Sequence, residues 1–262
     1  MNILLLAAAV FMGNLAGGYA GELSGDGGPD VGNEKHIVFL ISEDENNYEA
    51  HRTIPEYAGQ LEEHHGYKTT VILGEGERSA FHFPGLEVLS EADLLVVFTR
   101  RVALKPDQMN RIKKYVSEGK PLLGIRTANH AFTVREDVDT GYTDWPEFVP
   151  EVLGCENRGY GPVDPGTEVS IVPEAKDHPI LNDIQKDQWH SEGNVYHVAP
   201  LLDEQAKVLL RGQAGEQTEP VAWIRSTDFR GSVFYTSLGY PDDFDNKHFL
   251  QLLTNAVQFL IK

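Results

Sequence analysis

The sequence contains a single cysteine, Cys155, among its 262 residues. One cysteine cannot form a disulfide within the chain, so the hydrophobic core has to stabilise the fold. A dinucleotide-binding loop is also missing, because the glycine-containing stretch 74–78 (GEGER) lacks the third glycine of a G-x-G-x-x-G motif. The sequence therefore gives no support to a hydride-transfer enzyme.

Basic residues are few, with 22 Lys and Arg against 40 Asp and Glu, which gives a formal net charge of -18. A surface of this sign repels nucleic acid and anionic lipid, so neither is expected as a partner. The charge is compatible with a neutral or cationic small molecule, and it also fits a surface selected for solubility alone.

No hydrophobic run is long enough to cross a bilayer as a helix, since the apolar stretch 3–12 (ILLLAAAVFM) has only about half the required length. That length suits the core of a signal peptide, with small residues preceding a cut after Ala20. Because no Lys or Arg occurs before Lys35, a retained N-terminal anchor is the alternative. We expect a signal peptide at 1–20, a flexible linker at 21–35 and one domain at 36–262. The mature protein would then be periplasmic or secreted in a bacterial envelope, without membrane attachment.

Hydrophobic periodicity predicts an α/β fold. Short apolar runs predict strands at 36–42, 67–73, 93–99, 121–125, 167–172, 207–211, 221–226 and 231–237. Helical spacing predicts helices that end at Gly66, run from Pro106 to Gly119, and cover Phe249 to Leu260. Alternation of strands and helices predicts a mainly parallel sheet in a three-layer α/β/α, flavodoxin-like arrangement, with an irregular insertion at 136–166.

In such sheets ligands bind at the carboxyl ends of the strands. This rule selects the loops 42–45, 99–101, 126–130 and 238–243. We expect strands 36–42 and 121–125 to be neighbours, which would place Arg126 beside a carboxylate of 43–45. The segment 188–197 combines polar and aromatic residues and is interpreted as a lid that brings His190 or Glu192 over the same cleft.

Four stretches together carry a family resemblance. Strand 121–125 leads into a sharp turn (PLLGIRTANHAF, 121–132) with the form of a nucleophile elbow. The others are Asp177-His178-Pro179-Ile180, Glu192-Gly193-Asn194-Val195-Tyr196 and PVAWIRSTDFRGSVFYTSLGYPDDF (220–244). With these motifs the chain resembles the ThuA-like (trehalose utilisation) family over about residues 36–262. The resemblance implies a class I glutamine amidotransferase-like fold.

Two positions depart from the patterns that the resemblance implies. The elbow carries Arg126 where amidotransferases have cysteine, and Tyr240 follows Ser-Leu-Gly where the family often has histidine. Because arginine has only donors and stays cationic, it cannot attack a carbonyl, so glutaminase activity is excluded. The resemblance instead implies a role in the metabolism of a small carbohydrate, trehalose-like or a keto sugar. The alternative is a non-catalytic carbohydrate-binding or interaction module.

The candidate catalytic residues are His190, Glu192 and His130, because imidazole and carboxylate groups transfer protons near neutral pH. Candidate substrate-binding residues are Glu43, Arg126, Trp189, Tyr196, Tyr240 and Asp243. Each also has a structural interpretation: an ion pair of Arg126 with residues 43–45, a backbone contact for His130, core packing for the aromatic rings, and helix stabilisation for Asp243. A metal site of His190, Glu192 and His197 is a weaker alternative, since the spacing matches no strong motif. The cofactor, the reaction and a homo-oligomeric state stay open.

Overall fold

The computed structural model describes residues 34–184 and 188–262. The expected signal peptide and residues 21–33 of the expected linker lie outside this part of the chain, as do residues 185–187. No helix in the described part is long and apolar enough to span a bilayer. The strands and α-helices are β1 (His36–Ser42), α1 (Ala50–His65), β2 (Lys68–Glu77), β3 (Ala80–His82), β4 (Leu94–Phe98), α2 (Pro106–Ser117), β5 (Leu122–Ile125), β6 (Thr167–Ile171), β7 (Gln188–Ser191), β8 (Lys207–Ala214), β9 (Gln217–Ser226), β10 (Ser232–Thr236) and α3 (Lys247–Leu260).

The described strands form a mixed sheet of ten, in the order β3-β2-β1-β4-β5-β10-β9-β8-β6-β7. Strands β2, β1, β4, β5 and β10 are parallel. All other pairings are antiparallel. The expectation of a mainly parallel sheet is therefore wrong for the second half of the domain. The reason is that β8, β9 and β10 follow one another through short connections, which favour antiparallel neighbours.

Across the sheet the five parallel strands lie in the order β2-β1-β4-β5-β10. If they are numbered by their position in the chain, this order is 2-1-3-4-5. This is the flavodoxin-like strand order. Strand β2 is added on one side of β1 and the next parallel strand, β4, on the other, which creates a topological switch point between β1 and β4. Strand β4 thus lies between β1 and β5, so the expected direct pairing of 36–42 with 121–125 is wrong. The loops after β1 and β4 are the ones that meet at the switch point.

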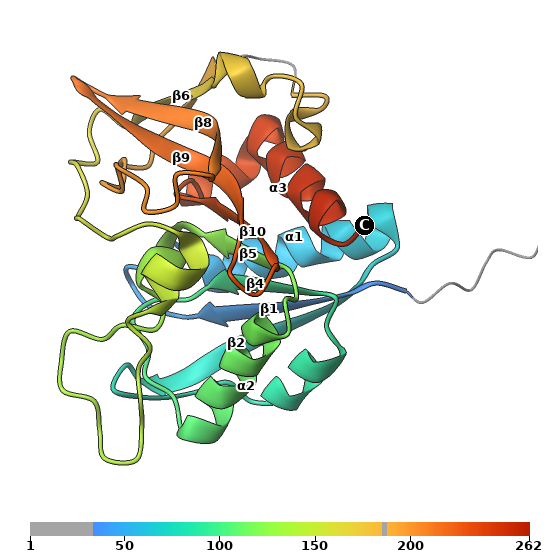
Figure 1. Ribbon diagram of the computed structural model, residues 1–262, viewed down its shortest axis with the longest axis vertical. Helices are drawn as coiled ribbons and strands as arrows, with labels where there is room; N and C mark the ends of the chain where they lie inside the picture. The colour runs from blue at the N-terminus through green and yellow to red at the C-terminus, as the bar shows by residue number, and fades with distance from the viewer. Residues whose placement is uncertain (1–33, 185–187) are drawn as a thin grey trace, which may run out of the picture. The chain divides into compact units, whose positions relative to one another are not determined.

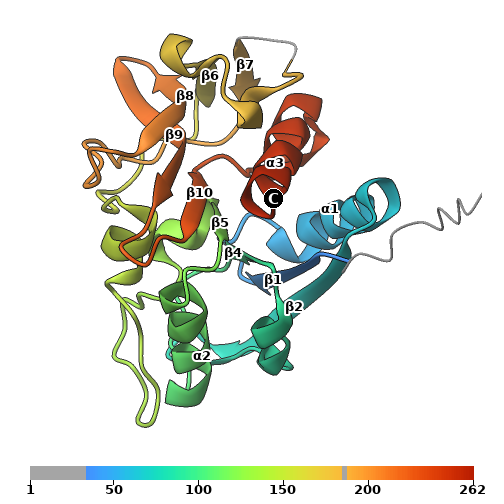
Figure 2. The same cartoon turned by 45° about the vertical axis from the view of Figure 1, so that its right-hand side comes forward.

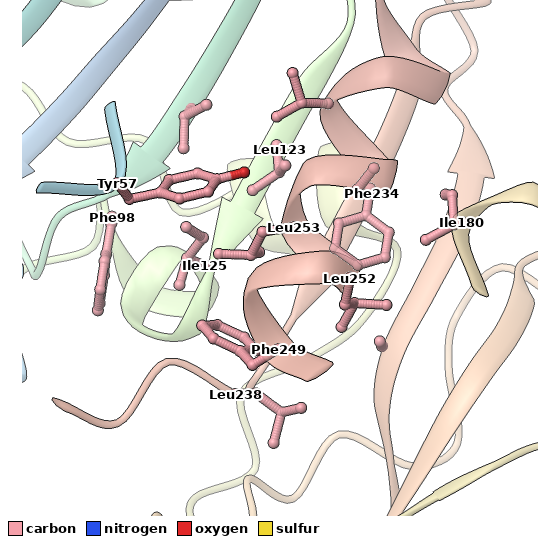
Figure 3. Close-up of a cluster of buried hydrophobic side chains, with 14 of the residues drawn as sticks. Tyr57, Phe98, Leu123, Ile125, Ile180, Phe234, Leu238, Phe249, Leu252 and Leu253 are labelled. Carbon is pink, nitrogen blue, oxygen red and sulfur yellow. The ribbon is translucent and has the colours of Figure 1, made fainter. Parts of the chain in front are cut away.

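Alternate residues of β1 contribute to two hydrophobic clusters on opposite faces of the sheet, because side chains along a strand alternate in direction. Ile37, Phe39 and Ile41 belong to the cluster that includes α1 and α3. Val38 and Leu40 belong to the cluster that includes α2. Figures 1 and 2 show α1 and α3 on one side of the parallel strands and α2 on the other. In Figure 3 the apolar stripe of α3 faces side chains of β5 and β10.

Two irregular segments shape the surface near the carboxyl ends of the strands. The segment expected to be an insertion, 136–166, contains a π-helical turn, Phe148–Leu153, between stretches without regular structure. The segment interpreted as a lid begins instead as β7, the outermost strand, which pairs with β6. Only its continuation from Gly193 to Tyr196 approaches the elbow.

Candidate functional site

Arg126 sits at the turn that follows β5. Its backbone has φ of 43°, a left-handed conformation that non-glycine residues seldom adopt. The hydroxyl of Tyr235 donates to the Arg126 carbonyl oxygen at 2.7 Å and so fixes the turn. The sharp turn between strand and helix that the sequence predicts is therefore present, and its first residue is strained in the way such elbows are.

The Arg126 side chain is buried, with 1% of its surface exposed. Nη1 donates to the Ser237 carbonyl oxygen at 2.8 Å, and Nη2 donates to Oδ1 of Asn194 at 2.6 Å. Its guanidinium also lies over the rings of Tyr48 and Tyr196, at 4.0 and 4.9 Å from their centroids. The expected ion pair with residues 43–45 is absent from the described contacts, and the partners of Arg126 are neutral.

Burial lowers the pKa of Arg126, but the surrounding tyrosine hydroxyls and Asp243 outweigh this effect and raise it above its ordinary value. The guanidinium is therefore charged at any working pH. Asp243 is itself buried, and its Oδ2 accepts hydrogen bonds from the backbone amides of Gly239 at 2.8 Å and Tyr240 at 2.9 Å. Asp243 thus stabilises the turn that carries Tyr240, which agrees with the structural alternative for this residue. It also places a carboxylate near Arg126.

Gly193 and Asn194 connect the segment after β7 to the elbow. A Cβ atom at position 193 would lie 3.0 Å from Nη1 of Arg126 and 2.9 Å from Cβ of Tyr240, so only glycine fits there. The Asn194 amide donates in turn to the Gly161 carbonyl at 3.0 Å. The sequence motif 192–196 is therefore explained by contact with Arg126, while the Glu192 side chain points to solvent, 62% exposed.

A cavity of about 400 Å³ opens in front of the Arg126 assembly, at the carboxyl edge of the parallel strands. The side chains of Tyr48, Tyr196 and Tyr240 form much of its wall, and the exposed Tyr160 and Val163 form its rim. The lining residues are Glu45, Asn46, Tyr48, Glu49, Arg100, Arg101, His130, Arg135, Tyr160, Val163, Asn194, Tyr196, Tyr240 and Pro241. Of the predicted site residues, the cavity thus brings together His130, Tyr196 and Tyr240, with Arg126 directly behind them.

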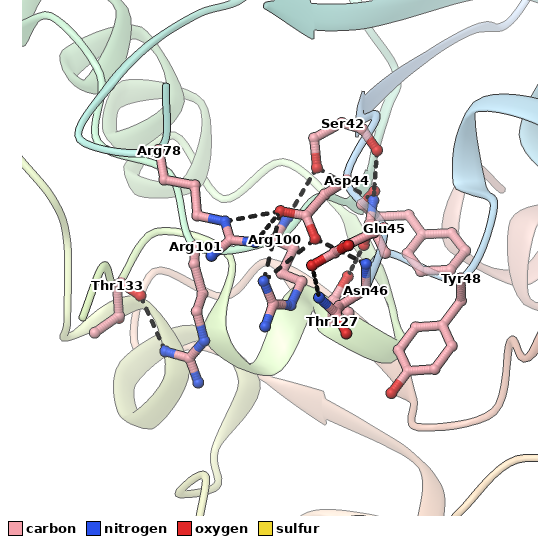
Figure 4. A network of polar contacts seen from close by, with 12 residues as sticks. Ser42, Asp44, Glu45, Asn46, Tyr48, Arg78, Arg100, Arg101, Thr127 and Thr133 are labelled. Carbon is pink, nitrogen blue, oxygen red and sulfur yellow. Dashed lines mark hydrogen bonds and ion pairs between the residues drawn. The ribbon is translucent and has the colours of Figure 1, made fainter. Parts of the chain in front are cut away.

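Arg100 is positioned by Asp44, which follows β1. Asp44 accepts from Arg78 at 2.5 Å and from Arg100 at 3.3 Å, and Figure 4 shows both guanidinium groups converging on it. Burial raises the pKa of Asp44, but the hydrogen bond from the Asn46 amide and the two arginines lower it overall. Asp44 therefore links the loop after β1 to the loop after β4, and it is the counter-ion of both Arg78 and Arg100.

His130 is 6% exposed and lines the cavity. Its Nδ1 contacts Oδ1 of Asn129 and lies 3.0 Å from Nδ2 of Asn157. Burial lowers the pKa of His130 well below its usual range, and the positive charges of the nearby arginines lower it further. The ring is therefore neutral at pH 7.

Four predicted site residues lie away from this cavity. Trp189 is buried against His248 in the core, in agreement with the core-packing alternative. His190 lies on the edge strand β7, where Nδ1 is 2.6 Å from Oε1 of Glu168. Glu192 is on the solvent side of the same segment, and Glu43 lines a separate cavity beside Arg78.

Within the described residues, no group of three or more His, Cys, Asp or Glu side chains is arranged to hold a metal ion. The weaker alternative of a site formed by His190, Glu192 and His197 is not supported, because His197 pairs with Glu219 at 3.4 Å instead.

Sequence reasoning missed several residues of the cavity as site residues. Tyr48 carries no motif signal, and Asn194 lies in the motif 192–196 but was not selected within it. Arg135 and Tyr160 lie in irregular segments where periodicity is uninformative. Arg101 could have been found, because the rule on strand ends selected the loop 99–101.

The sequence profile described as "ThuA: Trehalose utilisation" matches residues 38–260. The chain belongs to the ThuA family. Among solved structures, a protein described as ThuA-like from Bacteroides uniformis shares 15% identity at a TM-score of 0.64, covering 89% of this chain and 95% of that one. A second, from Parabacteroides merdae, shares 13% identity at a TM-score of 0.62, covering 87% and 90%.

The amino-terminal domain of mmIFT52 also has this fold, with 12% identity and a TM-score of 0.51, covering 86% of this chain and 97% of that domain. At these identities the likeness concerns the fold alone. No curated protein matches the chain.

The only cysteine of this ThuA-family chain is unsuited to nucleophilic catalysis. Cys155 is fully buried in the cluster that includes α2, and burial raises the pKa of its thiol to about 12. A thiol rather than a thiolate is present at neutral pH, and only the thiolate is an effective nucleophile. Neither Cys155 nor Arg126 at the elbow is therefore suited to supply a thiolate nucleophile.

Proposed function

We propose that this ThuA-family protein binds a small carbohydrate, trehalose-like or an oxidised keto sugar, in the cavity in front of Arg126. The observation that carries the proposal is the combination of four tyrosine side chains with a buried, neutral histidine around one cavity of about 400 Å³. That volume lies within the range of small-molecule sites. Tyr160 is 59% exposed at the rim, so its ring face is free to cover the apolar C–H side of a pyranose.

In the same proposal His130 is the acid/base group. A keto sugar carries an acidic C–H bond next to its carbonyl group, and the neutral imidazole of His130 can accept that proton. The guanidinium group of Arg100 can stabilise the negative charge that then develops on the carbonyl oxygen. This assigns the proton transfer to His130 rather than to His190, which lies on the outer strand.

The test follows the exchange of the proton next to the carbonyl group of a keto-trehalose into D₂O by NMR. Wild-type protein should catalyse the exchange, and His130→Gln should slow it by at least about 100-fold. His190→Gln is the matched control and should exchange at the wild-type rate. Loss of exchange in His190→Gln with retention in His130→Gln would reverse the assignment, and failure of any neutral or acidic sugar to bind would end the proposal.

A non-catalytic carbohydrate-binding module is the second candidate. It is favoured by the elbow, where the position that carries a nucleophile in amidotransferases is filled by a buried arginine with neutral partners. Binding of a sugar without any exchange in the same NMR experiment would decide for this candidate.

We also propose export to the bacterial envelope, supported by the apolar run 3–12 and the small residues before position 21. Intact-mass measurement on protein from its native host should then give a chain that begins near Gly21. Recovery of the chain with Met1 in the cytoplasm would contradict this.

A further inference from the structure

The charges around the cavity have the opposite sign to those of the protein as a whole. The chain carries -18, yet Arg100, Arg101 and Arg135 all line the cavity. The carboxylates in the same wall are Glu45 and Glu49. Glu49 is paired with Arg52 at 2.7 Å, and Arg100 is paired with Asp44 at 3.3 Å, which leaves Arg101 and Arg135 against the single carboxylate of Glu45. The excess positive charge is therefore concentrated at one place on an otherwise acidic protein.

A second cavity, of about 460 Å³, lies beside the first and shares Arg101, His130 and Arg135 with it. Its single carboxylate, Glu156, is paired with Arg158 at 2.9 Å. Arg101, His130 and Arg135 thus mark the junction of two cavities, and neither cavity supplies a free carboxylate at that junction.

Arg101 has no counter-ion there. It is 8% exposed, and its one described side-chain hydrogen bond runs from Nη1 to the Thr133 carbonyl oxygen at 3.2 Å. Its Nε is buried without a partner. A largely buried guanidinium without a negative partner is unfavourable, because part of its charge is moved out of water without compensation.

The backbone holds Arg101 in this position. Its φ of 52° is left-handed, and its amide donates to the His130 carbonyl oxygen at 3.1 Å. The next amide, from Val102, donates to the Ala131 carbonyl oxygen at 2.7 Å. Strain of this kind persists where the surrounding structure imposes it, and it is concentrated at functional sites.

Arg135 adds a second uncompensated charge. Its side chain is exposed, and its guanidinium makes no hydrogen bond or ion pair with any residue that the structure describes. Burial lowers the pKa of Arg101 to about 10, and repulsion from Arg135 and Arg100 contributes to the shift. Because Arg101 and Arg135 line both cavities, their charges meet at the junction of the two.

We infer that the ligand of this cavity is an acidic sugar, whose carboxylate or phosphate group is bound between Arg101 and Arg135 beside His130. The inference rests on the proposed carbohydrate function and specifies its substrate class. The sugar ring lies against the tyrosine side of the first cavity, and the anion supplies the counter-ion that Arg101 lacks. Because His130 is neutral, it adds nothing to the repulsion between the arginines.

The test is calorimetric titration with glucose, glucuronate and glucose 6-phosphate, and with trehalose and trehalose 6-phosphate. An acidic sugar should bind at least about 30-fold more tightly than its neutral counterpart, and the advantage should shrink with added salt. Arg101→Gln and Arg135→Gln should each remove most of this advantage. Arg111→Gln, the same change on the exposed surface of α2, should retain it.

The outcomes separate the two proposals. Tighter binding of glucuronate than of glucose 6-phosphate identifies the carboxylate as the recognised group. Tighter binding of glucose 6-phosphate identifies the phosphate, and either result supports the inference. Equal binding of neutral and acidic sugars overturns it and leaves the proposed function in place, as does inorganic phosphate that binds as tightly as the sugar phosphates. Absence of binding by every sugar overturns both. Because Arg135 is exposed, Arg135→Gln keeps the test valid if Arg101→Gln fails to fold.

Discussion

The guanidinium carbon of Arg126 lies 4.0 Å from the ring centroid of Tyr48. Tyr196 and Tyr240 surround the same group at 4.9 and 5.6 Å. A desolvated cation over an aromatic face contributes about 2 kcal/mol. Arg126 therefore holds these three tyrosine side chains of the cavity wall in place from behind, at the turn that follows β5.

Replacing Arg126 with methionine should lower the free energy of unfolding by about 3 kcal/mol or more. The Ser237 carbonyl and the Asn194 amide oxygen would lose a charged donor, at about 1–3 kcal/mol each where they stay buried, and the attraction to the rings would be lost as well. Urea denaturation measures the change. Arg111→Met on exposed α2 is the control and should stay within about 0.5 kcal/mol of wild type. Equal stability of Arg126→Met and wild type would contradict this role.

Asp243 and its neighbour Asp242 offer a matched pair. Asp243 is 2% exposed and accepts two backbone hydrogen bonds, whereas Asp242 is exposed. Asp243→Ala should therefore destabilise the fold by about 2–4 kcal/mol, because the amides of Gly239 and Tyr240 lose their acceptor. Asp243→Asn should cost less, and Asp242→Ala should have little effect. Thermal unfolding of the three variants checks the order, and a larger effect at Asp242 would be inconsistent with it.

The sequence predicts the parallel half of the fold well for a physical reason. Strand β1 is buried on both faces, so its apolar run has no competing interpretation, and α3 has a continuous apolar stripe. The short strands β3 and β7 were not predicted, because pairing at a sheet edge stabilises strands with weak sequence patterns. Strands β6, β8 and β9 of the antiparallel half were predicted, but the directions in which they pair depend on connections that periodicity does not describe.

The candidate site was predictable where the rule on strand ends applied, whereas Tyr196 was predicted from the segment 188–197. That rule selected Arg126 and His130 after β5 and Tyr240 after β10, and all three belong to the site. Trp189 and His190 were predicted as site residues from their residue types alone. The pairing of β6 with β7 places Trp189 in the core and His190 outside, because successive residues of a strand face opposite sides.

Purified protein should release no ammonia from glutamine, and Arg126→Cys should not create this activity. A cysteine at the elbow needs a base to form its thiolate, and the residue after Gly239 is Tyr240, whose ring lies 5.6 Å from the Arg126 guanidinium. A coupled glutamate assay against a buffer blank measures the reaction. Arg126→Cys with Tyr240→His is the informative companion variant, and activity in the single variant would refute the account of the elbow.

Protonation of His130 links stability to pH. Its pKa in the folded protein is lowered by burial and by nearby arginines, whereas in the unfolded chain the ring titrates near its ordinary value of about 6.5. Below that pH the unfolded chain takes up a proton that the folded protein excludes. The stabilisation from keeping His130 neutral is therefore complete above about pH 6.5 and is lost progressively as the pH falls toward the folded-state pKa.

The free energy of unfolding should accordingly fall between pH 7 and about pH 5, with His130 contributing at most about 1.4 kcal/mol per pH unit. His36 and His178, whose pKa values burial also lowers, add slopes of the same sign. His130→Gln removes one titrating group, so its curve should be flatter than that of wild type. Asn157→Ala removes only the neighbouring amide and should keep the wild-type slope. Urea denaturation across this range measures the slopes, and parallel curves for wild type and His130→Gln would show that His130 is not held neutral.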